Sequence, residues 1–211
     1  MSLIAKESAG GGYFLPEPGM HAARCYGVVD IGTQEGLYGP KSQVIIMWVL
    51  PECLHTYDEA KGPEAATLSK FLGTVLAPKS HIQPLLESWR GRPFTDEEKR
   101  GFNLINVLDK PCLVNIIHES RNDKMRAVIS SVSPPMKGQE IAESPIPVIS
   151  YDIDDRTGGA FTELPEWIQR KISESEEFKN DGLSVSNVGE TPPTTTGFQG
   201  ATGASEEDIP F

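Results

Sequence analysis

The chain has 211 residues, 38% of them hydrophobic, which is enough for one globular domain with a buried core and some appendages. No run reaches the roughly 18 to 20 apolar residues that a membrane span needs, and the first residues lack the basic and apolar regions of a signal peptide, so we expect a soluble, cytoplasmic protein. The three cysteines, Cys25, Cys53 and Cys112, show no paired spacing, which argues against a disulfide framework and against a zinc ribbon.

The formal net charge is −11, but the charges are distributed unevenly along the chain. Residues 60–137 carry 12 basic and 8 acidic side chains, whereas residues 1–59 carry 3 and 7, residues 138–180 carry 4 and 10, and residues 181–211 carry 0 and 5. The acidic sum argues against a nucleic-acid ligand. The basic excess on residues 60–137 nevertheless leaves one segment that can meet a polyanion.

The N-terminal half of the chain is predicted to be a strand meander. Residues 1–12 are small and polar and are expected to form a mobile arm. Strands are predicted over residues 20–31, with a bulge at Gly27, over residues 42–50, and over residues 66–72, where a helix is the alternative. The polar residues 54–64 are predicted to be an exposed loop.

Two capping boxes mark the helical part of the chain. Ser80 with Gln83 precedes an amphipathic stretch, because apolar side chains follow at helical spacing up to Trp89. Thr95 with Glu98 forms the second box, and residues 102–108 are predicted to be another short helical piece.

Residues 111–132 are predicted to be a β-hairpin, because two runs rich in β-branched residues flank a short polar turn. Alternation makes one face of this hairpin apolar and gives the other face Asn115, Arg126 and Ser130 among aliphatic residues. A polar ligand suits such a partly wet face. Pro134 and Pro135 end the hairpin, because proline cannot donate to a β-ladder.

The resulting order is three strands, a helix and two strands, which is the chain order of an OB-fold, a five-stranded Greek-key barrel. We therefore expect a mainly β protein with an OB-fold DNA-binding domain in residues 1–135. Residues 136–180 are predicted to be an acidic extension with a docking helix that begins at Pro165. Residues 181–211 are rich in Gly, Ser, Thr and Pro without a basic residue, and are expected to be a disordered acidic tail.

The last six residues resemble the C-terminal tip of bacterial single-stranded DNA-binding proteins. They are Glu206, Glu207, Asp208, Ile209, Pro210 and Phe211. Ile209 and Phe211 can enter an apolar pocket of a partner, while Asp208 and the terminal carboxylate pair with basic residues around it. The resemblance implies that the tip binds replication and repair proteins.

The body is similar to a phage-encoded group of single-stranded DNA-binding proteins with an OB-fold. Four motifs support this similarity: Pro-Glu-Pro-Gly at residues 16–19, Ser-Trp-Arg-Gly-Arg-Pro-Phe-Thr at 88–95, Phe-Asn-Leu at 102–104 and Leu-Pro-Glu-Trp-Ile at 164–168. Membership implies that the protein coats single strands during replication, recombination and repair in the host cytoplasm. The acidic body departs from this pattern.

Single strands are held by basic grooves and aromatic platforms, because every nucleotide has a phosphate and every base a π-face. The basic and polar candidates for DNA contact are Lys41, Lys70, Arg90, Arg92, Lys110, Asn115, Arg121, Lys124 and Arg126. The aromatic candidates are Tyr38, Trp48, Tyr57 and Phe94, with a core position as the alternative for Trp48.

The sequence shows no pattern typical of an enzyme, a metal site or a cofactor. The four histidines lack metal-ligand spacing, and no phosphate-binding glycine loop is present. The expected partners are single-stranded DNA and proteins that recognise the tip, with no membrane and with a monomer or a dimer as the working state. Two alternatives remain open, namely an adaptor that holds host repair enzymes without binding DNA, and a nucleic-acid enzyme on an OB-like barrel.

Overall fold

The computed structural model of the protein describes residues 14–37, 39–58, 60–154 and 160–180, without the side chains of Tyr57, Asp58 and Ala160. The predicted mobile arm, residues 1–12, and the predicted disordered tail, residues 181–211 with the tip, lie outside the described residues. None of the helices in the described part of the chain is long and apolar enough to cross a bilayer.

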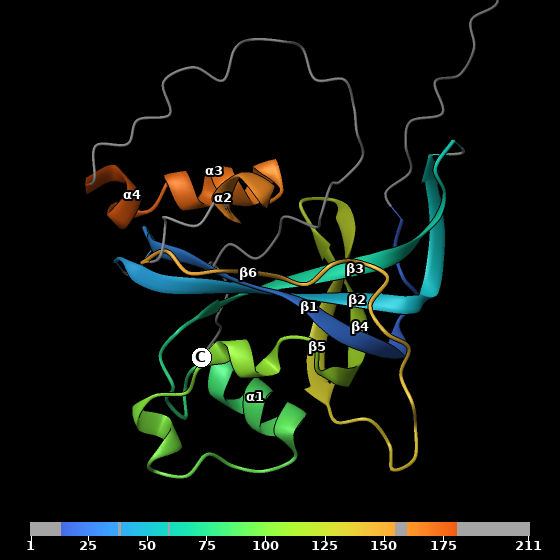
Figure 1. The fold of residues 1–211 in the computed structure, drawn as a ribbon, viewed down its shortest axis with the longest axis horizontal. Coiled ribbons are helices and arrows are strands. Elements are labelled where there is room, and N and C mark those ends of the chain that lie inside the picture. The colour runs from blue at the N-terminus through green and yellow to red at the C-terminus, as the bar shows by residue number, and fades with distance from the viewer. Residues whose placement is uncertain (1–13, 38, 59, 155–159, 181–211) are drawn as a thin grey trace, which may run out of the picture.

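The described chain is mainly β, and its strands form one curled sheet that makes a half-barrel (Figure 1). Five strands follow one another in the order β3-β2-β1-β4-β5 with antiparallel pairing, and β6 adds to β1 in parallel. The strands are β1 (Gly19–Gln34), β2 (Lys41–Asp58), β3 (Gly62–Gly73), β4 (Pro111–Arg121), β5 (Lys124–Ser133) and β6 (Ile149–Tyr151).

The predicted β-hairpin is confirmed as β4 and β5, which pair from Leu113 opposite Ser133 to Arg121 opposite Lys124. Asn122 and Asp123 form the two-residue turn, and both have positive φ angles, of 50° and 59°. Two consecutive left-handed residues are what a type I′ turn requires, and Asn and Asp tolerate this conformation better than most residues. The turn therefore fixes the register of the hairpin.

The predicted bulge at Gly27 is also confirmed, because the β1–β2 register shifts between Cys25 and Gly27. A Cβ at Gly27 would collide with the side chain of Met47 on β2, so glycine allows the close approach of the two strands there.

The prediction that residues 54–64 form a loop is wrong. β2 continues to Asp58 and β3 begins at Gly62, so the two strands extend as a paired arm beyond the rest of the sheet. The arm escapes prediction because much of it meets solvent, as exposed Leu54 and Thr56 illustrate, and it therefore lacks the apolar alternation of a half-buried strand.

The inner face of the half-barrel packs against the helical connection between β3 and β4. α1 (Ile82–Arg90) contributes Ile82, Leu86 and Trp89 to this core, where they meet strand residues such as Val114. Two 3₁₀ turns follow, η1 (Glu98–Arg100) and η2 (Leu104–Val107). Helical structure is thus confirmed in both predicted places, and the Thr95–Glu98 box forms reciprocally.

The outer face of β1, β2 and β3 is covered by a second core under the C-terminal helices (Figure 1). These helices are α2 (Ala160–Glu163), α3 (Glu166–Ser173) and α4 (Glu176–Asn180). Ile168 and Ile172 of α3 are fully buried, and Trp167 packs against Phe71 of β3. The docking helix predicted from Pro165 is therefore present and forms part of a full layer.

Polar contacts fasten this C-terminal layer to the end of β1. The Glu177 carboxylate accepts hydrogen bonds from the backbone N–H of Thr33 at 2.7 Å and from its hydroxyl at 2.6 Å. The Gln34 amide donates to the Lys171 carbonyl at 3.0 Å. Since the layer also buries apolar side chains against the outer face of the sheet, it is part of the folded body.

Candidate nucleic-acid interface

Two aromatic candidates for base stacking lie in the core, so those predictions are wrong. Trp48 is fully buried on β2, where it packs against Trp89 of α1 with ring centroids 5.8 Å apart. Phe94 is 5% exposed and meets Phe102 edge-on at 5.0 Å. Both rings belong to the inner core of the curled sheet, where large aromatic side chains bury much apolar surface.

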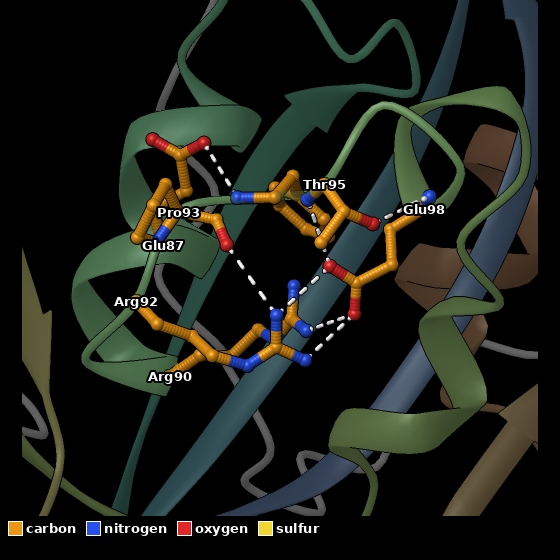
Figure 2. Close-up of polar contacts among 7 residues, drawn as sticks. Glu87, Arg90, Arg92, Pro93, Thr95 and Glu98 are labelled. Carbon is orange, nitrogen blue, oxygen red and sulfur yellow. Dashed lines mark hydrogen bonds and ion pairs between the residues drawn. The ribbon is translucent and has the colours of Figure 1, made fainter.

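Arg90, Arg92, Thr95 and Glu98 form a compact polar cluster in the connection that follows α1 (Figure 2), and Phe94 packs beside it. The guanidinium of Arg90 lies over the Phe94 ring at 4.4 Å and over the Phe102 ring at 5.1 Å. Arg90 Nη2 also donates to Glu98 Oε1. Arg92 completes the cluster, because its Nη2 and Nη1 donate to the two Glu98 oxygens at 2.7 Å and 2.9 Å.

In this cluster, which we call the Arg90–Glu98 cluster (Arg90, Arg92, Phe94, Glu98 and Phe102), two guanidinium groups share one carboxylate. Hydrogen bonds from Arg92, from the Thr95 backbone and from Arg90 hold the pKa of Glu98 far below its usual range. The hydrogen bond between Arg92 and Glu98 also raises the pKa of Arg92. The side chain of Arg90 is only 16% exposed. The structure therefore gives Arg90 and Arg92 an internal partner at the place where the sequence predicted a phosphate.

Lys70 on β3 also has an internal role. Its Nζ donates to the carbonyl of Ile129 on β5 at 2.7 Å, so one side chain bridges the two edge strands of the half-barrel. Burial lowers the pKa of Lys70. The position of its ammonium between the strands does not favour contact with DNA.

The structure does bring four of the predicted residues together on the outer face of the β4–β5 hairpin. Alternation places Asn115, Arg121, Lys124 and Arg126 on the face opposite the buried Val114 and its neighbours. Arg121 and Lys124 are cross-strand partners beside the turn, and Arg126 follows two residues later. We call this surface the hairpin face; one carboxylate, Glu119 opposite Arg126, lies within it.

Further residues of the hairpin face were not among the predicted contacts. Ile117 is 37% exposed beside Val128 of β5, and Met20 of β1, the partner of Asn115 in the adjacent pairing, is 55% exposed. The Asn115 amide donates to the Ser130 hydroxyl at 2.8 Å, and this hydroxyl donates to the Asn115 carbonyl at 3.0 Å. The alternation of the hairpin already indicated a mixed face; Met20 could not be assigned to it without the strand order.

The remaining predicted contacts are dispersed or lie outside the described residues. Lys41 is exposed at the start of β2, and Lys110 is exposed just before β4, away from the hairpin turn. Tyr38, the side chain of Tyr57 and the tip residues 206–211 are outside the description.

One aromatic pair near the hairpin was not predicted as functional. Phe14 stacks on His55 of β2 with ring centroids 4.2 Å apart and an interplanar angle of 11°. Two residues later, the Pro16 carbonyl accepts a hydrogen bond from His118 Nε2 of β4 at 2.8 Å. The segment before β1 thus contacts both the β2–β3 arm and the half of the β4–β5 hairpin nearer its turn.

Among the described residues, no group of three or more His, Cys, Asp or Glu could hold a metal ion. Burial raises the pKa of the Cys25 thiol to about 12 and also raises the pKa of Cys112, so both thiols stay protonated at neutral pH. The described cysteines therefore offer no activated nucleophile.

Comparison with protein-family models, with curated proteins and with solved structures finds no match for this chain. The functional argument therefore depends on the sequence and on the geometry of the hairpin face.

Proposed function

We propose that the protein is a sequence-independent single-stranded DNA-binding protein built on an OB-fold. It acts in phage DNA replication, recombination and repair in the host cytoplasm, and its C-terminal tip recruits partner proteins. The strand order β3-β2-β1-β4-β5, with α1 between β3 and β4, supports the OB assignment. The Lys70 bridge between β3 and β5 supports it as well, because those are the strands that meet when such a barrel closes.

The observation that carries the DNA-binding proposal is the hairpin face. Arg121, Lys124 and Arg126 lie at the turn end of one ladder, on the same face as Asn115. Basic side chains neutralise phosphates without regard to sequence, which is the property that a coating protein needs. A polar group between aliphatic side chains can then meet bases of any type.

The tip proposal comes from the sequence. About 25 residues separate Asn180 from Glu206, and a flexible chain of that length has a root-mean-square reach of roughly 25 to 30 Å. The tip could therefore extend beyond the domain to a partner. Phe211 supplies an apolar anchor, and Asp208 supplies a charge for a basic pocket.

The test is a titration of fluorescently labelled oligo-dT with the intact protein at low and at moderate salt. We expect binding that weakens as salt increases, with a slope of about −0.7 in log K against log salt for each phosphate contact. Labelled oligo-dC should bind comparably, and the same strand in duplex form more weakly. The absence of binding to both single strands at low salt would contradict the proposal.

An adaptor without DNA binding is the second candidate, and the net charge of −11 is the observation that favours it. Deleting residues 206–211 distinguishes the two functions. A single-strand-binding protein keeps its affinity for oligo-dT after the deletion and loses only its capture of tip-binding replication or repair proteins. An adaptor loses that capture and never binds the oligonucleotide.

A further inference from the structure

The outer surface of the sheet is divided into two parts that differ in what covers them. The outer face of β1, β2 and β3 is apolar, with Ile45 and Met47 fully or almost fully buried under α3. The outer face of β4, β5 and the first residues of β1 has no helix on it in the described chain, as Figure 1 shows. In OB-folds, oligonucleotides lie on the face of strands 2 and 3, and here that face is closed.

We propose, as an extension of the proposed function, that single-stranded DNA lies along the hairpin face and the adjoining start of β1 instead. The site consists of Arg121, Lys124 and Arg126 for phosphates and of Met20, Asn115 and Ile117 for bases. This inference depends on single-strand binding itself.

The charges support a polyanion as the occupant. Three basic side chains lie at the turn end of the face, against the carboxylate of Glu119 and that of Asp123 in the turn. The C-terminal layer has an acidic excess, because residues 160–180 carry 5 acidic and 3 basic side chains, with Glu163, Glu166 and Glu174 exposed. A polyanion is therefore repelled from the closed face and attracted to the hairpin face.

The uncharged half of the face supports contact with bases. Met20 is 55% exposed and Ile117 is 37% exposed, so both present apolar surface on this face. Met20 is the cross-strand partner of Asn115, and Ile117 follows Asn115 by two residues on β4. The Ser130 hydroxyl holds the Asn115 amide in place and leaves its Oδ1 and its second N–H for a ligand. A base can therefore pack on an aliphatic side chain and exchange a hydrogen bond with the amide.

The dimensions indicate a short site. Arg121 lies six positions after Asn115 along β4, and a strand rises by about 3.4 Å per residue, so the face is roughly 20 Å long. This length suits a few nucleotides, at the lower end of the roughly 4 to 16 that one OB-fold covers.

The experiment compares charge insertions at exposed apolar positions in the full chain. Met20→Glu and Ile117→Glu place a carboxylate on the proposed site, and Met136→Glu and Val148→Glu are matched controls at exposed positions elsewhere. Circular dichroism and size-exclusion chromatography of each variant verify folding and oligomeric state. Labelled oligo-dT then reports affinity at low salt.

We expect Met20→Glu and Ile117→Glu to weaken binding by roughly tenfold, because a carboxylate faces the phosphates, while the controls stay within about twofold. Should the folded site variants bind as well as the wild type, or should the controls weaken equally, the inference is overturned although the proposed function survives. A wild type that binds no single strand overturns both. Should the site variants change the oligomeric state but not the affinity, the face belongs to a second copy and the inference is also wrong.

Discussion

The Arg90–Glu98 cluster and the hairpin face are both rich in arginine, yet they use their charges differently. In the cluster, Arg90 and Arg92 converge on one carboxylate (Figure 2), and Arg90 also covers two phenylalanine rings. On the hairpin face, Arg121 and Lys124 are cross-strand partners beside the turn, and Arg126 is opposite Glu119. The arginines of the cluster thus converge on one carboxylate inside the connection after α1, whereas the basic side chains of the hairpin face lie along one face of a β-ladder.

This difference has a functional consequence. Variants in the cluster should reduce stability and leave DNA affinity unchanged. Variants on the hairpin face should reduce DNA affinity and leave stability unchanged.

Phe94→Ala should produce the largest loss. It removes a buried ring from the contact with Phe102 and from beneath the Arg90 guanidinium, and large-to-small substitutions of this kind cost about 3 to 5 kcal/mol. Urea unfolding measures the loss, and Phe94→Leu, which keeps most of the volume, should lose much less. A Phe94→Ala protein of normal stability but reduced oligo-dT affinity would contradict the packing role and would indicate that Phe94 stacks on a base.

Arg90→Gln should cost on the order of 2 kcal/mol, because it removes a charge-assisted hydrogen bond to Glu98 and the packing of a guanidinium on two rings. Arg90→Lys should not restore full stability, since an ammonium lacks the planar fork. Thermal and urea unfolding check both variants. Lysine that restores stability completely would show that only the charge matters.

Glu98→Gln should lower stability in a pH-dependent way. The pKa of Glu98 is depressed in the folded protein, so its ionised form stabilises the fold above the ordinary carboxyl value of 4.5, and this contribution is lost only as pH falls below that value. Urea unfolding of the wild type and the variant should therefore differ equally at pH 7 and pH 5.5. The difference should shrink progressively as pH falls below 4.5 and still be present at pH 3, because the folded-state pKa lies far below the usual range. Convergence already at pH 5.5 would contradict the assigned ion pairs.

Arg92→Gln should have the smallest effect. The Arg92 side chain is 53% exposed, and Arg90 and the Thr95 N–H still neutralise Glu98 without it. We expect a small decrease in unfolding midpoint and an oligo-dT affinity within about twofold of the wild type. A large affinity loss with a flatter salt slope would place Arg92 in the DNA site.

Much of the fold was predictable because the relevant signals are local. Alternation and turn chemistry gave the β4–β5 hairpin, and side-chain capping residues gave helical structure after Ser80 and after Thr95. The β2–β3 arm was missed, because a solvated ribbon such as that around Leu54 has no apolar period. β6 was missed as well, since three residues that add to β1 in parallel carry too little pattern.

The site was less predictable because it depends on contacts between distant segments. No spacing rule tells that Glu98 binds both Arg90 and Arg92, or that Lys70 reaches the Ile129 carbonyl across the half-barrel. The closure of the β1–β3 outer face likewise required knowing where α3 packs. Met20 joins the hairpin face only through the pairing of β1 with β4.

The central claim is that the hairpin charges, and not those near the cluster, meet phosphates. The most direct test measures the salt dependence of oligo-dT affinity for two triple variants that each remove three positive charges. The hairpin variant changes Arg121, Lys124 and Arg126 to Gln, and the matched variant changes Arg92, Lys99 and Arg100 to Gln. We predict that the first flattens the slope by about 2, from about 0.7 per lost phosphate contact, and that the second leaves it unchanged. An unchanged slope in the hairpin variant, or an equal loss in both, would contradict the account.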